Sequence, residues 1–403
     1  MAKKKTIKKT NRRKGNYRVA LFVQDMGSYG EQAVQAIAHY AKTSGNWRVD
    51  MATFGEVSLQ DVAARQVDGV IFGQWDPLAP LLAAIDAGGM PALDISGKGL
   101  TDVPPARVTP DDRRVGAVAA EHFIGRGFHH FSYYGLPEEF DTRWEIARRE
   151  GYCAAVENRG YQCDWFRGTA KTWQELHDDA HLEALRKWLK RLRRPNAILC
   201  CTDAFCYEIL RVARECGILV PDELAVCGVD NRLWICTLAS PTITSIPLDG
   251  AQAGSRGAEL LAGMMAGEAA PSKPVLIAPL EIVQRESTDF FAFQDSDVVA
   301  TLQYIRDNAH RPFSVDDILD AVPVSRRSIE IRFKEATGQT LQTAIWRSHL
   351  EKATQLLWES RLPMLAVSRH AGFRSSAVFN VMFRKQHGIT PTEFRRRAKR
   401  PIR

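Results

Sequence analysis

Polar and aromatic residues that could hold a small hydroxylated molecule follow two short apolar runs near the N-terminus. The runs are residues 17–23 and 69–73, and the residues that follow them are Asp25, Tyr29, Gln32, Gln74, Trp75 and Asp76. A carboxylate or amide can bridge neighbouring hydroxyls, and an aromatic ring can cover the apolar face of a sugar ring. An Asp after a strand is also a common helix cap, and a Trp is often a packing residue, so both interpretations stay open.

A second pattern with chemical meaning is a repeat of fifty residues near the C-terminus. The repeated positions are Ser325, Phe333, Lys334, Gly338 and Thr340, which correspond to Ser375, Phe383, Arg384, Gly388 and Thr390. Each unit has a short helical pattern, residues 315–322 or 364–371, followed by a turn and a helix that Ser opens and Gly closes. This pattern is typical of a helix-turn-helix, whose second helix can enter the major groove of DNA. Residues 340–360 predict a rigid helix between the two units.

Charge is distributed unevenly along the 403 residues. Residues 1–16 carry a net charge of +8, and residues 291–403 also carry +8, so the whole-chain value of +7 leaves −9 for the middle. Basic ends suit a polyanion such as DNA, whereas an acidic middle predicts a different ligand. Residues 1–16 are predicted to be a disordered leader, which either aids solubility or contacts phosphates.

The middle of the chain alternates short β-branched runs with amphipathic stretches in two successive series. This alternation predicts two lobes, each a parallel, doubly wound α/β layer, with a ligand cleft at the facing strand ends. After Thr288 the pattern becomes entirely helical. The predicted organisation is therefore a two-lobed α/β sensor domain over 17–290 and an all-α domain over 291–403.

Residues 17–290 resemble the periplasmic-binding-protein-like sensor of the LacI/GalR repressors. The resemblance is long and ordered, and it is carried by VDGVIFG (67–73), RVTPDDRRVGAVAAEHFIGRGFHHFSYYG (107–135), RREGYCAAV (148–156), residues 195–231, residues 240–261 and LEIVQREST (280–288). This chain departs from the repressors because only a basic segment, and no helix-turn-helix pattern, precedes the first predicted strand. DNA binding is therefore expected from the C-terminal repeat.

This resemblance implies further ligand-binding residues. Asp230, Asn231 and Arg148 match positions that often hold ligand in the family. Asp203 matches a position of mixed role, and Arg143 is a nearby alternative to Arg148. An Arg side chain donates hydrogen bonds in a planar fork, which suits adjacent hydroxyls.

Residues 297–399 resemble the DNA-binding domain of the AraC/XylS family, through VSRRSIEIRFKEATG (324–338), AGFRSSAVFNVMFRKQHGITPTEFR (371–395) and the helix between them. The resemblance implies groove-facing residues on two reading helices: Arg326, Arg327, Glu330, Ile331, Ser376, Ala377, Asn380 and Val381. Arg327 and Asn380 are the sharpest candidates for base contacts, because Arg pairs with guanine and Asn with adenine. The residues predicted to hold phosphates are Arg332, Lys334, Arg374, Arg384, Lys385 and 395–397.

The order of these two domains, together with residues 226–246 and 375–383, resembles regulators that activate xylose operons. This resemblance implies D-xylose as effector, double-stranded operator DNA as partner, a homodimer, and RNA polymerase contact if the protein is an activator. A different sugar or a ligand-independent repressor stays an alternative. No apolar run approaches the roughly 20 residues of a membrane span, so a cytoplasmic, nucleoid-associated protein is expected.

Common enzyme motifs are missing from the sequence, including Gly-x-Ser-x-Gly, the Walker sequence and His-Glu-x-x-His. His177 and His181 have a metal-compatible spacing but lack a third ligand nearby, so we expect surface histidines. An enzyme, a cofactor and a metal are therefore not expected. The eight cysteines lie in the middle third without Cys-x-x-Cys spacing, and we expect them to be reduced core residues.

Overall fold

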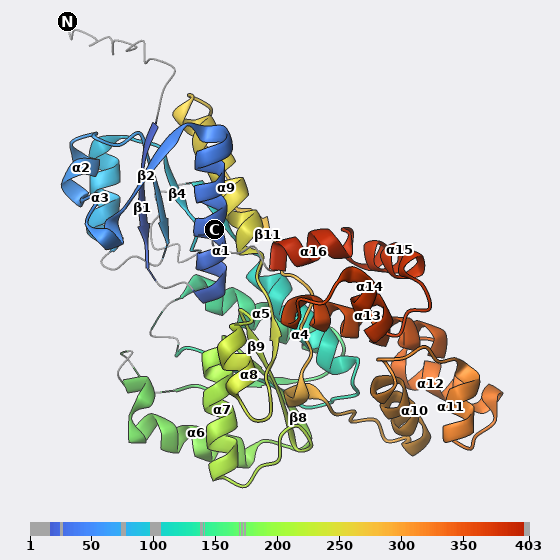
Figure 1. Cartoon of the computed structure of the whole chain (residues 1–403). Helices are drawn as coiled ribbons and strands as arrows, with labels where there is room; N and C mark the ends of the chain where they lie inside the picture. Colours follow the sequence, from blue (N-terminus) through green and yellow to red (C-terminus); the bar gives the residue numbers. More distant parts are fainter. Residues whose placement is uncertain are drawn as a thin grey trace, which may run out of the picture.

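The chain folds into two α/β lobes and a helical C-terminal part that lies beside them (Figure 1). The computed structural model describes residues 17–24, 27–73, 78–96, 106–137, 140, 142–168, 170, 172 and 175–398. The expectations for residues 1–16, Asp25, Gln74, Trp75 and Asp76 therefore lie outside the described residues. Among those that are described, no helix combines the length and the apolar character that a membrane span requires.

The first lobe contains a parallel sheet with strand order β11-β5-β4-β3-β1-β2. Its strands are β1 (Tyr17–Val23), β2 (Trp47–Met51), β3 (Gly69–Gly73), β4 (Ala92–Asp94), β5 (Ala106–Pro110) and β11 (Val275–Ile277). Its α-helices are α1 (Gly27–Tyr40), α2 (Leu59–Ala63), α3 (Leu78–Gly88) and α9 (Gly250–Met265). Alternate residues of β1 serve the two faces, because Ala20 and Phe22 pack with α2 and α3 while Val19 and Leu21 pack with α1 and α9. Such two-sided burial is why these strands are continuous apolar runs.

The second lobe contains another parallel sheet, with strand order β10-β9-β8-β6-β7. Its strands are β6 (Phe131–Tyr134), β7 (Cys163–Trp165), β8 (Asn196–Cys200), β9 (Leu224–Val229) and β10 (Thr244–Ile246). Its helices are α4 (Asp112–Ile124), α5 (Arg143–Glu157), α6 (Asp179–Arg191), α7 (Asp203–Glu215) and α8 (Leu233–Leu238). Apolar residues of α6 and α7 cover one face, and those of α4 and α5 cover the other. The predicted pair of parallel, doubly wound sheets is confirmed.

Two glycines bring α4 and α5 into backbone contact. A Cβ at Gly116 would overlap the carbonyl oxygen of Arg148, and a Cβ at Gly151 would overlap that of Arg113. Any larger residue at either position would push the two helices apart. This close approach fixes the side chains that α4 and α5 present to the space between the lobes.

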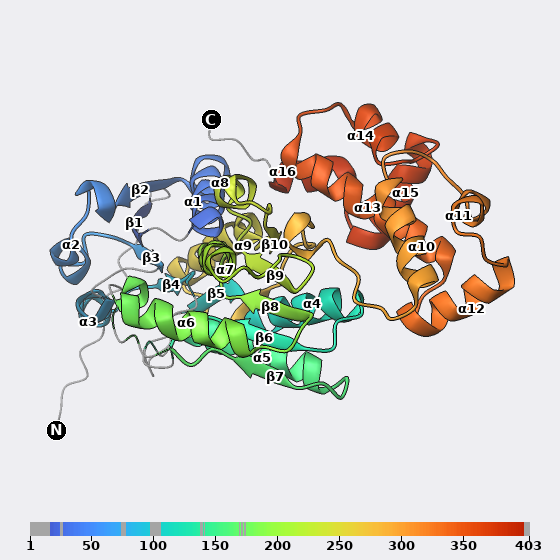
Figure 2. The ribbon, with the colours of Figure 1, turned by 90° about the horizontal axis from the view of Figure 1, so that it is seen from below.

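The C-terminal part is helical, as predicted, and lies to one side of both lobes in two perpendicular views (Figure 2). Its helices are α10 (Ser296–Asp307), α11 (Val315–Ala321), α12 (Arg326–Thr337), α13 (Leu341–Glu359), α14 (Met364–His370), α15 (Ser376–His387) and α16 (Pro391–Ala398). The fifty-residue repeat has a structural basis, since Ser325 and Ser375 cap α12 and α15 through their side chains. Gly338 and Gly388 end the same two helices, each at φ 72°.

Two sequence expectations were wrong, one about the cysteines and one about a histidine. Cys153 on α5 and Cys163 on β7 are joined in a disulfide, because the packing of this helix beside this strand brings the two thiols together. His181 is 2% exposed rather than on the surface, because it lies on the face of α6 that packs against the sheet. Its imidazole lies 3.5 Å from the Tyr134 hydroxyl.

Candidate ligand cleft and DNA-reading helices

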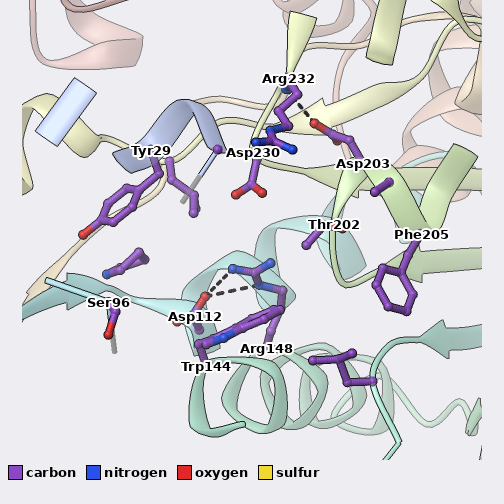
Figure 3. A pocket seen from close by; sticks show the side chains of 15 residues that line it. Tyr29, Ser96, Asp112, Trp144, Arg148, Thr202, Asp203, Phe205, Asp230 and Arg232 are labelled. Carbon is purple, nitrogen blue, oxygen red and sulfur yellow. Dashed lines mark hydrogen bonds and ion pairs between the residues drawn. The ribbon is translucent and has the colours of Figure 1, made fainter. Parts of the chain in front are cut away.

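A cavity of about 300 Å³ lies between the lobes, at the carboxyl ends of strands from both sheets. In parallel α/β proteins, ligands bind at this edge of the sheet. The first lobe contributes Tyr29 and Ser96 to the wall, and the second lobe contributes Asp112, Trp144 and a group of residues after β8 and β9 (Figure 3). Strand ends from both lobes therefore enclose one small space lined by apolar and charged side chains, as the two α/β series predicted.

A buried ion pair forms one side of the cavity. The Arg148 guanidinium donates to Oδ1 of Asp112 from Nη2 at 2.6 Å and from Nε at 3.2 Å (Figure 3). Both side chains are almost fully buried, at 3% and 6% exposed. Nη1 donates to the carbonyl oxygen of Cys201, and the guanidinium carbon lies 4.9 Å from the centre of the Trp144 ring. Burial lowers the pKa of Arg148, but Asp112 and Asp230 outweigh this effect and keep the residue charged.

Asp230 lies on the opposite side of the same cavity, after β9 (Figure 3). Burial raises the pKa of its carboxyl group to about 7. Asp230 and Asn231 have φ values of 97° and 49°, in a region that residues other than glycine rarely adopt. Backbone strain of this kind is concentrated at binding sites. A carboxyl group with a pKa near neutrality can either accept or donate a hydrogen bond to a ligand hydroxyl.

Asp203 supports the loop that carries Asp230. Its Oδ1 accepts from the Ser245 hydroxyl at 2.5 Å, and its Oδ2 accepts from the backbone N–H of Arg232 at 2.7 Å. Burial raises the pKa of Asp203 to about 6. The residue lines the cavity and also positions residues 230–232, while its contact with a ligand stays a prediction.

The structure brings together four of the residues that the sequence proposed for the ligand, namely Arg148, Asp203, Asp230 and Tyr29. It places three other described candidates elsewhere: Arg143, Gln32 and Asn231 are not part of the cavity wall. The Asn231 side chain accepts a hydrogen bond from Arg285 instead. Trp234 on α8 is 65% exposed and is also not part of the wall.

Sequence reasoning missed several residues of the cavity wall, chiefly Asp112, Trp144 and Arg232. Trp144 precedes Arg148 by one helical turn, and this spacing could have indicated a shared face. Asp111 and Asp112 are adjacent at the start of a helix, where the sequence suggests that each carboxylate caps the helix. Only Asp111 caps α4, which leaves Asp112 free to bind Arg148.

The second helices of both helix-turn-helix units present their predicted residues to solvent. The exposed members of the predicted set are Arg326, Arg327, Glu330, Ile331, Lys334, Arg374, Ala377, Asn380, Val381, Arg384 and Lys385, and Ser376 is half-buried. Ile331 and Val381, which are fifty residues apart, are 49% and 67% exposed. Both side chains are therefore accessible on the outer faces of the two helices.

Neighbouring arginines on α12 differ in how they are held. Arg326 donates to Glu330 at 3.0 Å and to Asp316 at 3.2 Å. The Arg327 side chain has no hydrogen bond or ion pair to another described residue. Arg332, for which a phosphate contact was predicted, binds Asp295 and Asp297 and so fastens α12 to the start of α10.

Comparison with known proteins agrees with this architecture. Residues 120–288 match a family model described as a periplasmic binding protein-like domain, and residues 318–397 match one described as a helix-turn-helix domain. The fold, the cleft and the two reading helices together define a DNA-binding transcription regulator with a periplasmic-binding-protein-like sensor. The resemblances to a LacI/GalR-type sensor and to an AraC/XylS-type DNA-binding domain are confirmed.

Similarity to particular regulators extends along nearly the whole chain. The Xylose operon regulatory protein of Escherichia coli (strain K12) is 29% identical over 387 residues, which cover 94% of this chain and 97% of the relative. The protein of the same name from Haemophilus influenzae (strain ATCC 51907 / DSM 11121 / KW20 / Rd) is 27% identical over 386 residues, covering 94% and 98%. These relatives are regulators and not enzymes, as expected for this chain.

Comparison with solved structures also finds similarity to transcription regulators. The structure of a xylose-binding transcription activator aligns with a TM-score of 0.59 and 28% identity, covering 95% of this chain and 98% of that one. A complex of the transcriptional regulator CelR with cellobiose aligns with a TM-score of 0.54 and 22% identity, covering 67% and 84%. The second likeness shows the fold of the sensor alone.

Proposed function

We propose that this protein activates xylose utilisation genes by binding D-xylose between its lobes and operator DNA through α12 and α15. The observation that carries the proposal is the buried Arg148–Asp112 pair facing Asp230 across a small cavity, with Trp144 beside it. Regulators named for xylose that match along almost the entire chain support the choice of this sugar.

Each part of this wall suits one part of a sugar. The Arg148 fork can donate to two adjacent hydroxyls, and Asp230 can accept from hydroxyls on the opposite side. The Trp144 ring can cover a face of C–H groups. Asp203 and Tyr29 complete the proposed set, and the predictions for Arg143, Gln32 and Asn231 remain to be tested.

On the DNA side, Arg327 and Asn380 are proposed to read bases, together with the small or apolar residues around them. Lys334, Arg374, Arg384 and Lys385 are proposed to hold phosphates. The active form is proposed to be a cytoplasmic, nucleoid-associated homodimer that contacts RNA polymerase at its promoters. Its sensor is proposed to extend over 17–290 and its DNA-binding domain over 291–403.

Calorimetric titration of the full-length protein with a panel of pentoses and hexoses tests this function. We expect one saturable response, with D-xylose as the tightest ligand. The same ligand should also stabilise the fold. At a free-ligand concentration of a hundred times the Kd, a ligand that binds only the folded state raises the free energy of unfolding by about 2.7 kcal/mol. A response to another sugar alone would reassign the effector, and no response to any sugar would refute the sensor role.

A further inference from the structure

The loop of residues 230–232 belongs to the second lobe, lines the ligand cavity and also contacts the first lobe. Asp230 and Arg232 line the cavity in the second lobe. From the first lobe, the Ser28 hydroxyl on α1 donates to the carbonyl oxygen of Asp230 at 3.0 Å. A Cβ at Gly27 of the same helix would lie 2.9 Å from Nε of Arg232, so this helix start touches the loop closely. A change in the spacing of the lobes must therefore move or strain this loop.

One buried guanidinium joins this loop to the DNA-binding part. Nη2 of Arg285 donates to Oδ1 of Asn231 at 2.8 Å, and its Nε donates to Oε1 of Glu359 at 2.9 Å. Nη1 donates to the carbonyl oxygen of Ile243 at 2.7 Å. The backbone of Arg285 is held on both sides, because the Thr244 hydroxyl accepts from its N–H and donates to its carbonyl. The Arg285 side chain is 2% exposed.

Glu359 is the last residue of α13, the helix that connects the two helix-turn-helix units. Leu341 and Ile345, at the start of α13, belong to the apolar core of the first unit, whereas Leu350 and Leu357 belong to that of the second. A displacement of the Glu359 end of α13 is therefore transmitted to the unit that contains α15.

We propose that Asn231, Arg285 and Glu359 form the link through which the occupied cavity changes the placement of the second reading helix. The link rests on the proposed function, since it needs a ligand that moves residues 230–232. A buried guanidinium cannot lose a hydrogen-bond acceptor without a large desolvation cost, because its charge is then left uncompensated. A shift of Asn231 therefore either carries the Glu359 end of α13 along or breaks one of the two Arg285 hydrogen bonds, to Asn231 or to Glu359. Such a choice between two discrete arrangements is what allows one site to bias another.

Glu359→Gln tests the link, because it keeps an acceptor oxygen for Arg285 but removes the charge. The full-length protein is titrated with a duplex selected from random DNA by the wild type, at fixed salt, with and without saturating D-xylose. The measured quantity is the ratio of the two DNA dissociation constants. We expect sugar affinity to change less than about threefold and the ratio to change at least about threefold. The matched control is Glu393→Gln on α16, whose carboxylate pairs with Arg396 and has a similar exposure of 30% against 28%.

If Glu359→Gln binds sugar normally and keeps the wild-type ratio of DNA dissociation constants, the link is overturned. The proposed function would still stand. Failure of the wild type to bind any sugar would overturn both, and calorimetry reveals this before DNA is added. A second measurement uses Asn231→Ala alone and combined with Glu359→Gln. Because the residues act in series, the double variant should have the same ratio as Asn231→Ala, whereas additive changes would contradict the proposal.

Discussion

The cleft and the reading helices are both proposed to recognise their ligands through arginine, but the two arginines lie in opposite surroundings. Arg148 is 3% exposed and donates to Asp112 and Cys201, whereas the Arg327 side chain is exposed and has no partner among the described residues. A small neutral molecule must displace water to bind, so its site gains from polar groups that are already desolvated and oriented. A polyanion is attracted by solvated cations through its phosphates.

This difference determines what a substitution does in each region. In the cleft, folding and binding depend on the same side chain, because Arg148 holds Asp112 and is also proposed to hold the ligand. On α12 and α15, the exposed residues contribute little to the core, which is formed by inward residues such as Phe333 and Phe383. Substitutions in the cleft should therefore change stability and ligand binding together, and those on the reading helices should change DNA binding alone.

The largest expected effect is that of Arg148→Ala. Loss of the guanidinium leaves Asp112 buried and unpaired, so the free energy of unfolding should fall by about 3–5 kcal/mol and sugar affinity by more than about a hundredfold. Arg113→Ala is the matched control, because Arg113 and Glu150 form an ion pair between the same two helices at the surface. It should cost less than about 1 kcal/mol. Urea unfolding and calorimetry measure both effects, and equal losses would contradict the distinction.

Next in size is Arg327→Ala on the first reading helix. A bidentate base contact contributes about 1–3 kcal/mol of discrimination, so affinity for the selected duplex should fall by about fivefold to 150-fold. Preference at one base position should flatten, as measured by competition with single-base variants of the duplex. Arg326→Ala should have the smaller effect, because its fork is already bound to Glu330 and Asp316. The reverse order would refute the assignment.

A third prediction concerns pH and the cleft alone. Because burial raises the pKa of Asp230 to about 7, the sugar-free protein holds this carboxyl group largely protonated at pH 6 and largely ionised at pH 8. Sugar hydroxyls donate to the ionised form, so affinity should rise by up to about tenfold between these values. Without ligand, the stability contributed by this group is present at low pH and is lost as the pH rises through about 7. Calorimetry at several pH values measures the profile, which Asp230→Asn should flatten.

The smallest expected effect is that of Lys385→Ala on the second reading helix. A phosphate contact has no sequence preference, so cognate and random duplexes should both bind a few-fold more weakly, and the salt slope should fall by about one. Anisotropy titrations across a salt series measure both quantities. Lys187→Ala, a change of an exposed lysine on α6, is the control and should leave DNA binding unchanged. A loss confined to the cognate duplex would indicate base reading instead.

The sequence predicted the architecture because the necessary signals are local. Alternating apolar runs and amphipathic stretches define parallel α/β layers, and Ser and Gly at matched positions define the ends of α12 and α15. It also predicted Arg148, Asp203, Asp230 and Tyr29 at the cavity, through resemblance and through their places after strands. The predictions failed where a side chain faces inward on its own element, as His181 does.

What only the tertiary structure decided is which polar groups face one another. Asp112 and Arg148 are 36 residues apart, Asn231 and Arg285 are 54 apart, and Arg285 and Glu359 are 74 apart. Local sequence fixes the elements on which these residues lie, since helix and strand patterns depend on near neighbours. Which partner each residue meets depends on how the elements pack, through contacts such as the glycine crossing of α4 and α5.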